Sequence, residues 1–320
     1  MARRKKTEEA TEGQRPVTLQ NPADIDLRLL RVFCVVVESG GFSTAQSELN
    51  IGQSTISTHM AELEAYLDMR LCRRGRGGFA LTEQGETVYE AAQRLFAALE
   101  NFGSDVNEIR GKLTGSLSLG ILHTMVTDSG NRVTEAIATF KKKAPEVRIN
   151  LTVTSPSEIS RALTDGRLHL GFSTGHHREP GLDYEELYSE RQLLYCAVGH
   201  PLFEAAPNNI TMKDLRDLDY VTRGYEEREA FQEKIRARVT SIAYPLEGIS
   251  TMILTGGFIG TMPIDYARIW TERDIMRPLL PDVLNAQTQL YVVSKRGARP
   301  VALVKAFRKE LAAVLTAYRT

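Results

Sequence analysis

Three short helical patterns, separated by two glycine-containing breaks, constrain the fold of this chain most strongly. The first is expected from Asp26, with its apolar side chains on one face, and Gly40-Gly41 ends it. A second short helix, which Ser43 is expected to cap, turns at Asn50-Ile51-Gly52 into a third helix over about 53–67. The sequence therefore predicts a helix-turn-helix.

The third helix presents a polar face near its start. Its inward stripe contains Ile56, Met60 and Leu63 at helical spacing. The outward side chains are short and form hydrogen bonds: Gln53, Ser54, Thr55, Thr58 and His59. A recognition helix places its first turns in the major groove, where such side chains reach base edges. The alternative, a solvated helix face, stays open on this segment alone.

A basic hairpin is expected directly after this helix. Its four arginines, Arg70, Arg73, Arg74 and Arg76, surround three glycines within the segment 69–82. Glycines allow a tight turn, and arginines beside a duplex gain affinity by releasing counterions from phosphates. A solvated loop is the alternative, but the position after a helix-turn-helix favours a DNA-contacting wing with Arg73, Arg74 and Arg76.

A long helix is expected from Glu83. Its apolar residues follow one another at alternating intervals of four and three: Val88, Ala92, Leu95, Leu99, Phe102, Val106, Ile109 and Leu113. A heptad seam of this length favours pairing with a second helix, and we expect a homodimer. Burial of the seam against the helix's own chain remains the alternative.

Beyond Gly115 short apolar strands alternate with helical patterns. The expected strands are 117–121, 147–153, 168–172, 192–198, 220–222, 258–262 and 290–293, and the expected helices are about 130–143, 156–165, 226–238, 247–255 and 300–317. Such alternation predicts parallel sheets flanked by helices. We expect two small sheets with a cleft between them, because ligands of such folds bind at the carboxyl ends of strands.

Composition excludes several other classes of protein. The formal net charge is zero, so positive charge must act as local clusters. No apolar run approaches the roughly 20 residues of a membrane helix, and nothing near the start resembles a signal peptide, so we expect a cytoplasmic protein without membrane contact. The cysteines Cys34, Cys72 and Cys196 lie far apart, which predicts buried, reduced thiols without a metal site or redox pair.

Two rival functions are those of an α/β enzyme and of a solute-binding protein. An α/β enzyme would be expected to carry a catalytic or phosphate-binding motif, and the sequence has no GxGxxG, GxxxxGK[ST], HExxH, GxSxG or CxxC. A solute-binding protein would have no use for residues 26–82. We therefore expect neither catalytic residues nor a cofactor, and a DNA-binding regulator is the favoured function.

The resemblance to a known family is carried by a long ordered set of residues. These are Leu29, Phe33, Val36, Gly41-Phe42-Ser43, Ala45, Leu49, Gln53, Ser57, Leu63-Glu64, Leu67, Leu71, Arg74, Leu81-Thr82 and Gly85. The segment 26–90 thus resembles a LysR-type transcriptional regulator, and a weaker match follows through His200-Pro201-Leu202 and Gly257-Phe-Ile-Gly260. Gln46, Gly52, Ser54, Thr58, His59 and Cys72 depart from the usual pattern.

The resemblance implies an α/β protein with an N-terminal all-α winged helix-turn-helix, a long linker helix and an effector domain of two Rossmann-like α/β subdomains resembling periplasmic binding proteins. The implied parts are a disordered tail 1–24, the DNA-binding domain 25–83, the linker helix 84–113 and the effector domain 114–320. Subdomain I is expected over about 114–188 and 288–320, and subdomain II over about 189–287.

The resemblance also implies partners and a small-molecule site. It adds Ser43 and Ser57 to the DNA contacts, predicts a homotetramer on double-stranded DNA, and makes contact with RNA polymerase an expectation. The implied effector-binding residues are Leu122, His123, Thr124, Met125, Ser155, Ser157, Thr174, Thr222 and Arg223. We expect an anionic effector, because a helix amino end after Ser155 and the Arg223 guanidinium suit a carboxylate. The alternatives are that Ser155 or Ser157 is only an N-cap, and that His123 and Arg223 are ordinary polar residues.

Overall fold

The computed structural model divides into two compact units, one ending at Leu95 and the other beginning at Phe96. The residues that it describes are 25–75, 78–109, 113–123, 125–175, 178–206, 209–224, 230–298 and 301–317. The expected tail, 1–24, lies outside them. The division falls within the long helix α4 (Glu83–Ile109), so this helix contributes to both units.

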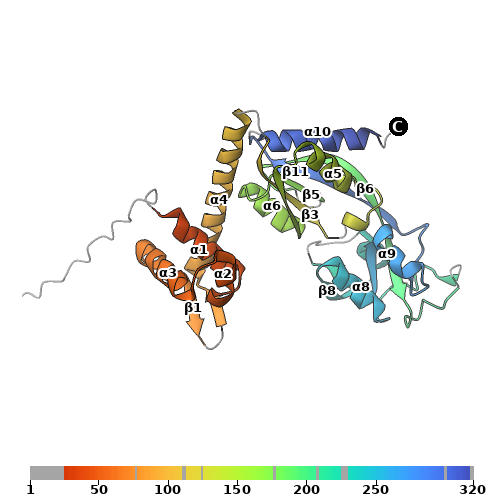
Figure 1. Cartoon of the computed structure of the whole chain (residues 1–320). Helices are drawn as coiled ribbons and strands as arrows, with labels where there is room; N and C mark the ends of the chain where they lie inside the picture. Colours follow the sequence, from red (N-terminus) through yellow and green to blue (C-terminus); the bar gives the residue numbers. More distant parts are fainter. Residues whose placement is uncertain are drawn as a thin grey trace, which may run out of the picture. The chain divides into compact units, whose positions relative to one another are not determined.

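The first unit begins with the three expected helices, α1 (Leu27–Glu38), α2 (Phe42–Leu49) and α3 (Gln53–Leu67) (Figure 1). Their inward residues form one core that includes Phe33, Ala45, Ile56 and Leu63, all at 0% exposure. The apolar face of each helix is therefore buried against the other two, as the spacing predicts.

The expected role of Ser43 as a helix cap is wrong. Helix α2 begins at Phe42, so Ser43 lies exposed in its first turn and Gly41 occupies the N-cap position. Gly41 adopts φ 150°, and a Cβ there would lie 3.4 Å from the Cβ of Phe79, so glycine suits both the backbone and the contact. Thr44 stabilises the entry, because its hydroxyl donates to the carbonyls of Ser39 and Gly41.

The wing is an antiparallel hairpin of β1 (Cys72–Gly75) and β2 (Gly78–Leu81), in which Gly75 pairs with Gly78. Glu64 of α3 holds its first strand, because its Oε1 accepts from the backbone nitrogens of Leu71 at 2.7 Å and Cys72 at 3.3 Å. The hairpin is thereby fixed to the same helix that carries the polar face.

Helix α4 starts in close contact with the wing. The Thr82 hydroxyl donates to the carbonyl of Arg70 at 2.6 Å and accepts from the Gly85 nitrogen at 2.9 Å. A Cβ on Gly85 would lie 1.9 Å from the Leu71 carbonyl oxygen, so only glycine fits there.

The second unit contains one mixed sheet rather than the two separate sheets expected. Its strands are β3 (Gly115–Leu122), β4 (Val147–Thr154), β5 (Leu170–Thr174), β6 (Leu182–Ala197), β7 (Asp219–Arg223), β8 (Arg238–Ala243), β9 (Ile259–Pro263), β10 (Met276–Pro278) and β11 (Asn285–Lys295). Their order is β4-β3-β5-β11-β6-β9-β7-β8, with β10 paired to β6.

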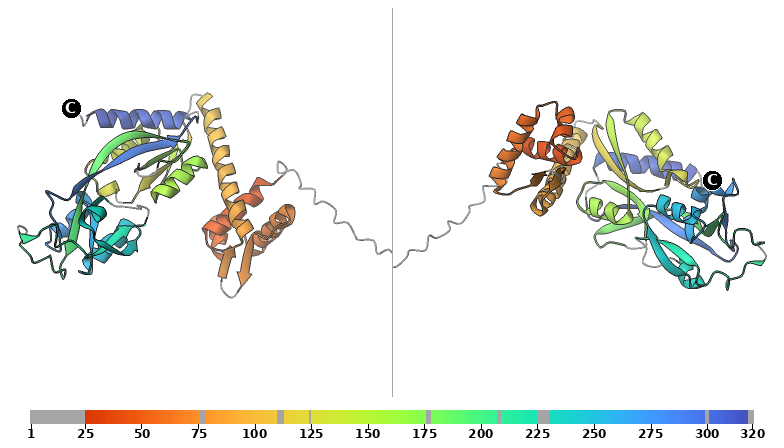
Figure 2. Two further views of the ribbon diagram at one scale, coloured as in Figure 1. Left: turned by 180° about the vertical axis from the view of Figure 1, so that it is seen from behind. Right: turned by 90° about the horizontal axis from the view of Figure 1, so that it is seen from below.

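Parallel strands occur in two groups that a pair of long antiparallel strands joins. β4, β3 and β5 are parallel to one another, as are β8, β7 and β9. Between them β6 and β11 pair along eleven register positions and run from one group to the other (Figure 2). The prediction of purely parallel sheets fails because β6 begins ten residues before the expected strand and crosses both halves of the unit.

Helices cover this sheet: α5 (Val133–Lys143), α6 (Pro156–Thr164), α7 (Ala230–Ile235), α8 (Leu246–Leu254), α9 (Ile264–Thr271) and α10 (Ala302–Ala317), with the 3-10 turn η2 (Met125–Thr127) after β3. In the first half Phe140 of α5, Phe172 of β5 and Phe307 of α10 meet edge to face. The expected helix over 226–238 is wrong at its end, because Arg238 already opens β8; residues 226–229 lie outside the described part.

Candidate DNA-binding and effector sites

The polar residues expected on the recognition helix lie at its surface. Gln53, Ser54, Thr55 and Thr58 are exposed, while Ser57 and His59 are half-buried. The Thr58 hydroxyl donates back to the Ser54 carbonyl at 3.1 Å. The face is therefore accessible over the first two turns of α3, where a recognition helix contacts bases.

Gln46, one of the departures from the family pattern, serves the start of α3. Its side-chain oxygen accepts from the Gln53 nitrogen at 3.2 Å, and its amide donates to the Ser43 carbonyl at 3.3 Å. Gly52, the N-cap residue of α3, forms no side-chain capping bond. Gln46 therefore satisfies an amide that an alanine would leave to solvent.

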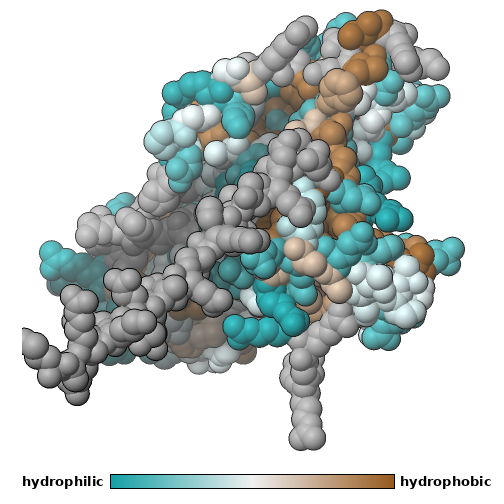
Figure 3. Space-filling view, turned by 90° about the vertical axis from the view of Figure 1, so that its left-hand side faces the viewer, coloured by the Kyte–Doolittle hydropathy of each residue, from teal (hydrophilic) through white to brown (hydrophobic). Residues whose placement is uncertain are grey.

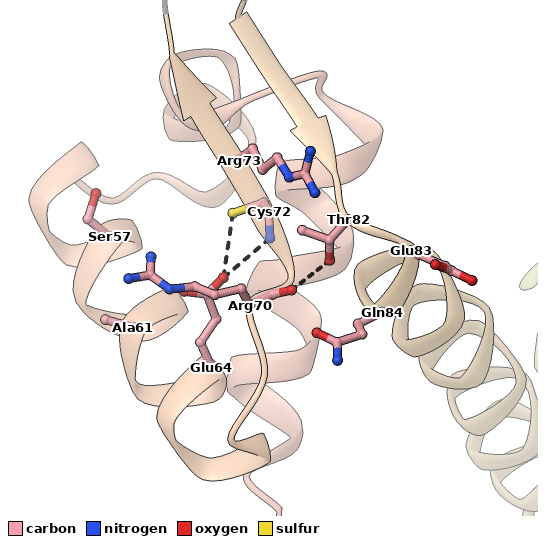
Figure 4. A pocket seen from close by; sticks show the side chains of 9 residues that line it. All are labelled: Ser57, Ala61, Glu64, Arg70, Cys72, Arg73, Thr82, Glu83 and Gln84. Atoms are coloured by element: carbon pink, nitrogen blue, oxygen red, sulfur yellow. Dashed lines mark hydrogen bonds between the residues drawn. The ribbon is translucent and has the colours of Figure 1, made fainter.

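One concavity joins α3 to the wing (Figure 4). It has a volume of about 1010 Å³, and its lining residues are Ser57, Ala61, Glu64, Arg70, Cys72, Arg73, Thr82, Glu83 and Gln84. Ser57 and Ala61 come from the recognition helix, whereas Arg70 and Arg73 precede or belong to the wing. Ser57 of the helix and Arg73 of the wing thus line one concavity. The side chain of Arg74 and the whole of Arg76 lie outside the described residues.

The seam of α4 changes from buried to exposed along the helix. Ala92 is 2% exposed, whereas Leu95, Leu99, Phe102 and Ile109 are 38%, 39%, 67% and 87% exposed. Val88 and Val106 are half-buried. Apolar side chains gather on this side of the molecule where α4 runs (Figure 3). The first part of the seam is thus occupied by the chain itself, and the remainder leaves large apolar side chains uncovered.

The expected effector residues lie at or after the ends of four strands in the second unit, with Ser155 and Ser157 after β4. Leu122 and half-buried His123 end or follow β3, Thr174 ends β5, and Thr222 and Arg223 end β7. Met125 is buried in η2. Thr124 lies outside the described residues. Because β4, β3 and β5 are parallel neighbours, their carboxyl ends lie on one edge of the sheet.

Ser155 is the N-cap of α6. Its hydroxyl accepts from the Glu158 nitrogen at 3.4 Å and lies 3.1 Å from the hydroxyl of exposed Ser157. The alternative that this serine caps a helix is therefore confirmed, and it leaves a ligand contact at Ser155 or Ser157 as an expectation.

The two halves of the second unit touch at Ser129 and Asp265. Asp265 Oδ2 accepts from the Ser129 nitrogen at 2.9 Å and from its hydroxyl at 2.6 Å. Ser129 follows β3 and η2, and Asp265 follows β9 in the first turn of α9. Burial acts to raise the pKa of Asp265, but the Ser129 bonds and Arg268 outweigh it and hold the pKa below its ordinary value. The carboxyl ends of both parallel groups therefore face each other here.

Beside this bridge lies a buried polar network that sequence reasoning missed, apart from Arg223. Arg223, at 6% exposure, donates to Gln192 Oε1 at 2.8 Å, and the Gln192 amide donates to Glu190 at 2.8 Å. Tyr188, Glu190 and Gln192 alternate on one face of β6, and Gln192 is where β6 begins to pair with β9. The sequence feature that could have indicated this network is the alternation of polar residues just before the apolar run 193–197.

In this network, burial disfavours the charged forms of the Asp128 and Glu190 carboxyl groups. Burial raises the pKa of Asp128, although hydrogen bonds from the Gly130 backbone and the Tyr188 side chain act in the opposite sense. Burial, with Asp128 next in effect, raises the pKa of Glu190 to about 7, although Arg223 acts in the opposite sense. Buried carboxylates with elevated pKa values are typical of functional sites.

Two features of the part of the chain that the structure describes concern metal ligands and thiols. No group of three or more metal-ligating side chains gathers there. Cys34, Cys72 and Cys196 are buried, and burial raises the thiol pKa of Cys34 and of Cys196 to about 12. Nor does any helix of those residues have the length and apolarity to cross a bilayer.

Each of the two units matches a known protein family. Residues 27–86 match the bacterial regulatory helix-turn-helix proteins of the LysR family, and residues 110–316 match the LysR substrate-binding domain. The chain is a LysR-type transcriptional regulator. Its two units therefore carry the DNA-binding and the substrate-binding parts of that family.

Curated relatives of this LysR-type regulator are themselves transcriptional regulators. The HTH-type transcriptional activator BauR of Pseudomonas aeruginosa is 41% identical over 298 residues, covering 92% of this chain and 97% of the relative. A probable HTH-type transcriptional regulator of Synechococcus elongatus, LrrA, is 27% identical over 203 residues, covering 63% of this chain and 67% of the relative.

Solved structures confirm the fold. The crystal structure of CbnR, a LysR family transcriptional regulator, aligns with a TM-score of 0.65 at 18% identity, covering 91% of this chain and 99% of that one. Full-length CbnR complexed with its target DNA gives the same TM-score at 20% identity, with the same coverage of both chains. An N-terminal helix-turn-helix joined to an α/β domain is thus the architecture that this regulator shares with them.

Proposed function

We propose that this regulator binds an operator duplex through α3 and the wing, as a homodimer whose α4 helices pair along their exposed seam. The observation that carries the proposal is the concavity lined by Ser57 of α3 and Arg73 of the wing, together with the exposed polar residues of the first two turns of α3. Two such surfaces held at a fixed spacing would read two half-sites. We further propose assembly of two dimers into a tetramer and contact with RNA polymerase.

The proposed switch is a small-molecule effector that binds where the two groups of parallel strands meet. Its binding would change the angle between the halves of the second unit, and through the oligomer the spacing of the wings. Only a difference in effector affinity between the two arrangements can drive such a change. The buried Arg223 supports an effector with an anionic group. Catalysis forms no part of the proposal, and a protein that acts on DNA in a bacterial cell would work in the cytoplasm.

A mobility-shift assay with the DNA flanking its own gene tests the proposal. Arg73→Ala is expected to weaken binding to all DNA sequences by a similar factor. The substitution removes a positive charge that would contact the phosphate backbone, which is the same in every sequence. Ser54→Ala is expected to change which bases are preferred while retaining the salt dependence. Lys142→Ala, an exposed charge removed from α5, is the matched control.

Two outcomes would contradict the proposed DNA-binding surface. The Arg73 variant would bind DNA as tightly as the wild type, or the Lys142 variant would lose as much affinity for DNA as the Arg73 variant. A shift that does not weaken with added salt would also count against it.

A further inference from the structure

Helix α4 contacts the second unit with the side opposite its exposed seam. With about 3.6 residues per turn, Asn101 and Ser104 lie on the side of the helix away from Leu99 and Val106. Ser104 is 7% exposed, whereas Leu99 is 39% exposed. At the start of β3, a Cβ on Gly115 would lie 2.6 Å from the Ser104 hydroxyl oxygen, so this strand packs closely on the helix. One side of α4 is therefore held by its own chain, while the opposite side carries the exposed part of the seam.

A histidine joins this side of α4 to the sheet. His169 Nε2 lies 2.7 Å from Asn101 Oδ1, and His169 Nδ1 accepts from the Ser118 nitrogen at 2.9 Å. Because a backbone nitrogen can only donate, Nδ1 carries no proton, and the ring proton on Nε2 donates to Asn101. A single neutral imidazole thus connects α4 with β3. We call the set Asn101, His169 and Ser118 the imidazole clamp.

The imidazole clamp stands on the two strands that lead to expected effector residues. His169 immediately precedes β5, which ends at Thr174, and Ser118 lies within β3, which ends at Leu122. The two strands are paired, and the His169 nitrogen donates to the Ser118 carbonyl at 2.9 Å. Paired strands are rigid elements that carry a displacement from one end to the other. A shift at their carboxyl ends therefore reaches the imidazole.

A cavity of about 600 Å³ borders the imidazole clamp. Asn101 and His169 both line it, together with the buried side chains of Leu163 and Val304. Where a cavity adjoins a helix, close packing contributes less to holding the helix, so hydrogen bonds carry a larger share. The cavity also leaves room for α4 to shift when the bond to Asn101 is lost.

We propose that His169 is a positioning residue that fixes α4 on the second unit, so that a movement of β3 or β5 at the effector site changes the placement of the wings in the dimer. This inference rests on the proposed function and specifies how its switch reaches the DNA. His169 acts through Asn101 of α4 and the Ser118 backbone of β3.

The imidazole clamp is expected to open in acid. Burial lowers the pKa of His169 below its ordinary value of 6.5, so the ring is neutral at neutral pH. Protonation places a proton on Nδ1, which then cannot accept from Ser118. The charged side chains around the clamp are bound to other groups: Arg308 to Glu185, Arg296 to Asp183 and Arg167 to Glu158, while Lys295 donates to the Thr164 carbonyl.

Amide hydrogen exchange of the full-length protein tests the contact. His169→Asn retains an acceptor at about the place of Nδ1 but no donor for Asn101, whereas the longer amide of His169→Gln retains that donor. His169→Asn and Asn101→Ala should speed exchange of the amides in 98–109 about threefold or more, and His169→Gln should preserve their protection. Asn107→Ala, the same substitution at a half-buried position of α4, is the matched control. Unchanged exchange in both clamp variants, or equal acceleration in the control, would overturn the proposal.

A pH profile separates positioning by the imidazole from general support of the fold. After correction for intrinsic exchange rates, protection of 98–109 in the wild type should fall as the pH is lowered below 6.5, whereas in His169→Gln it should stay constant. The variant keeps every other histidine, so the difference between the two profiles belongs to His169. Parallel profiles would contradict the proposed role.

DNA binding tests the consequence for the wings. In a mobility shift with the DNA flanking its own gene, His169→Asn should change the affinity for the intact site by about threefold or more and leave the affinity for a single half-site unchanged, because wing spacing rather than the wing surface is altered. An equal change on both DNAs, or no change on the intact site, would overturn the coupling. If the wild type binds neither DNA, the proposed function fails, whereas hydrogen exchange still decides whether His169 fixes α4.

Discussion

Single polar side chains decide how the surfaces of this regulator are held. Glu64 accepts two backbone amides at the start of β1, and Gln46 accepts the first amide of α3. Glu190 has the opposite effect on stability, because its burial disfavours the charged form of its carboxyl group. The first two side chains stabilise backbone that would otherwise lack a partner, whereas Glu190 carries the desolvation cost of a buried carboxyl group.

The cost at Glu190 predicts a pH dependence of stability. Its pKa is about 7 in the folded protein and 4.5 ordinarily, so between these values the folded state retains a proton that the unfolded state releases. Stability therefore falls as pH rises through this window, by an amount on the order of 3 kcal/mol for this group. In Glu190→Gln this loss is absent, so the variant should gain stability relative to the wild type from pH 4.5 to pH 7.

Urea unfolding across that pH range measures the difference. Glu186→Gln should differ from the wild type by a constant amount. Parallel stability curves for the wild type and the Glu190 variant would show that this carboxyl does not titrate as described.

Whole elements add constraints that single residues do not show, and α4 is the clearest case. One end of this helix packs on the wing through Gly85, whereas its middle exposes leucine and phenylalanine side chains. A helix that is buried at one end and apolar but uncovered further along is suited to connect a folded unit to a second copy.

The two glycines of α4 should respond oppositely to alanine. Gly85→Ala places a Cβ 1.9 Å from the Leu71 carbonyl oxygen, which should destabilise the protein by about 1–3 kcal/mol. Gly103→Ala meets nothing within 4 Å and should stabilise the helix by about 1 kcal/mol. Chemical denaturation of the two variants provides the comparison, and a destabilised Gly103 variant would argue that another chain contacts that position.

The exposed seam predicts the oligomeric state. Leu99→Glu should weaken the dimer more than tenfold, because two leucines per dimer lose about 2 kcal/mol of burial each. Ala98→Glu introduces the same charge at the neighbouring exposed position and should leave the dimer intact. Sedimentation equilibrium measures both, and equal weakening by the two variants would exclude a specific seam.

At the scale of the whole molecule, long strands and one bridge bring distant residues together. β6 and β11 connect the two groups of parallel strands, and Ser129 reaches Asp265 across 136 positions of sequence. The site is therefore made by residues that no local pattern joins. Because the bridge consists of two hydrogen bonds to one carboxylate, it is a weak contact between the two halves of the second unit.

Loss of this bridge should loosen the facing segments. Ser129→Ala removes the 2.6 Å hydroxyl bond and should speed hydrogen exchange of the amides in 125–131 and 264–268 several-fold, with the strands of the sheet unaffected. Thr152→Ala, which deletes an exposed hydroxyl on β4, is the control. Unchanged exchange in both segments would show that the bridge does not hold the two halves together.

The sequence by itself determined the helix-turn-helix, the hairpin, the long helix and most strands, because each depends on periodicity and turn residues within a few positions. The apolar stripe of α3 and the break at Gly40-Gly41 are of this kind. Tertiary structure alone decided that β6 and β11 merge the expected sheets into one, that Gly41 rather than Ser43 precedes α2, and that Asp128, Tyr188 and Glu190 meet near Arg223. Those features arise from pairing and burial between residues far apart in the chain, which local spacing does not encode.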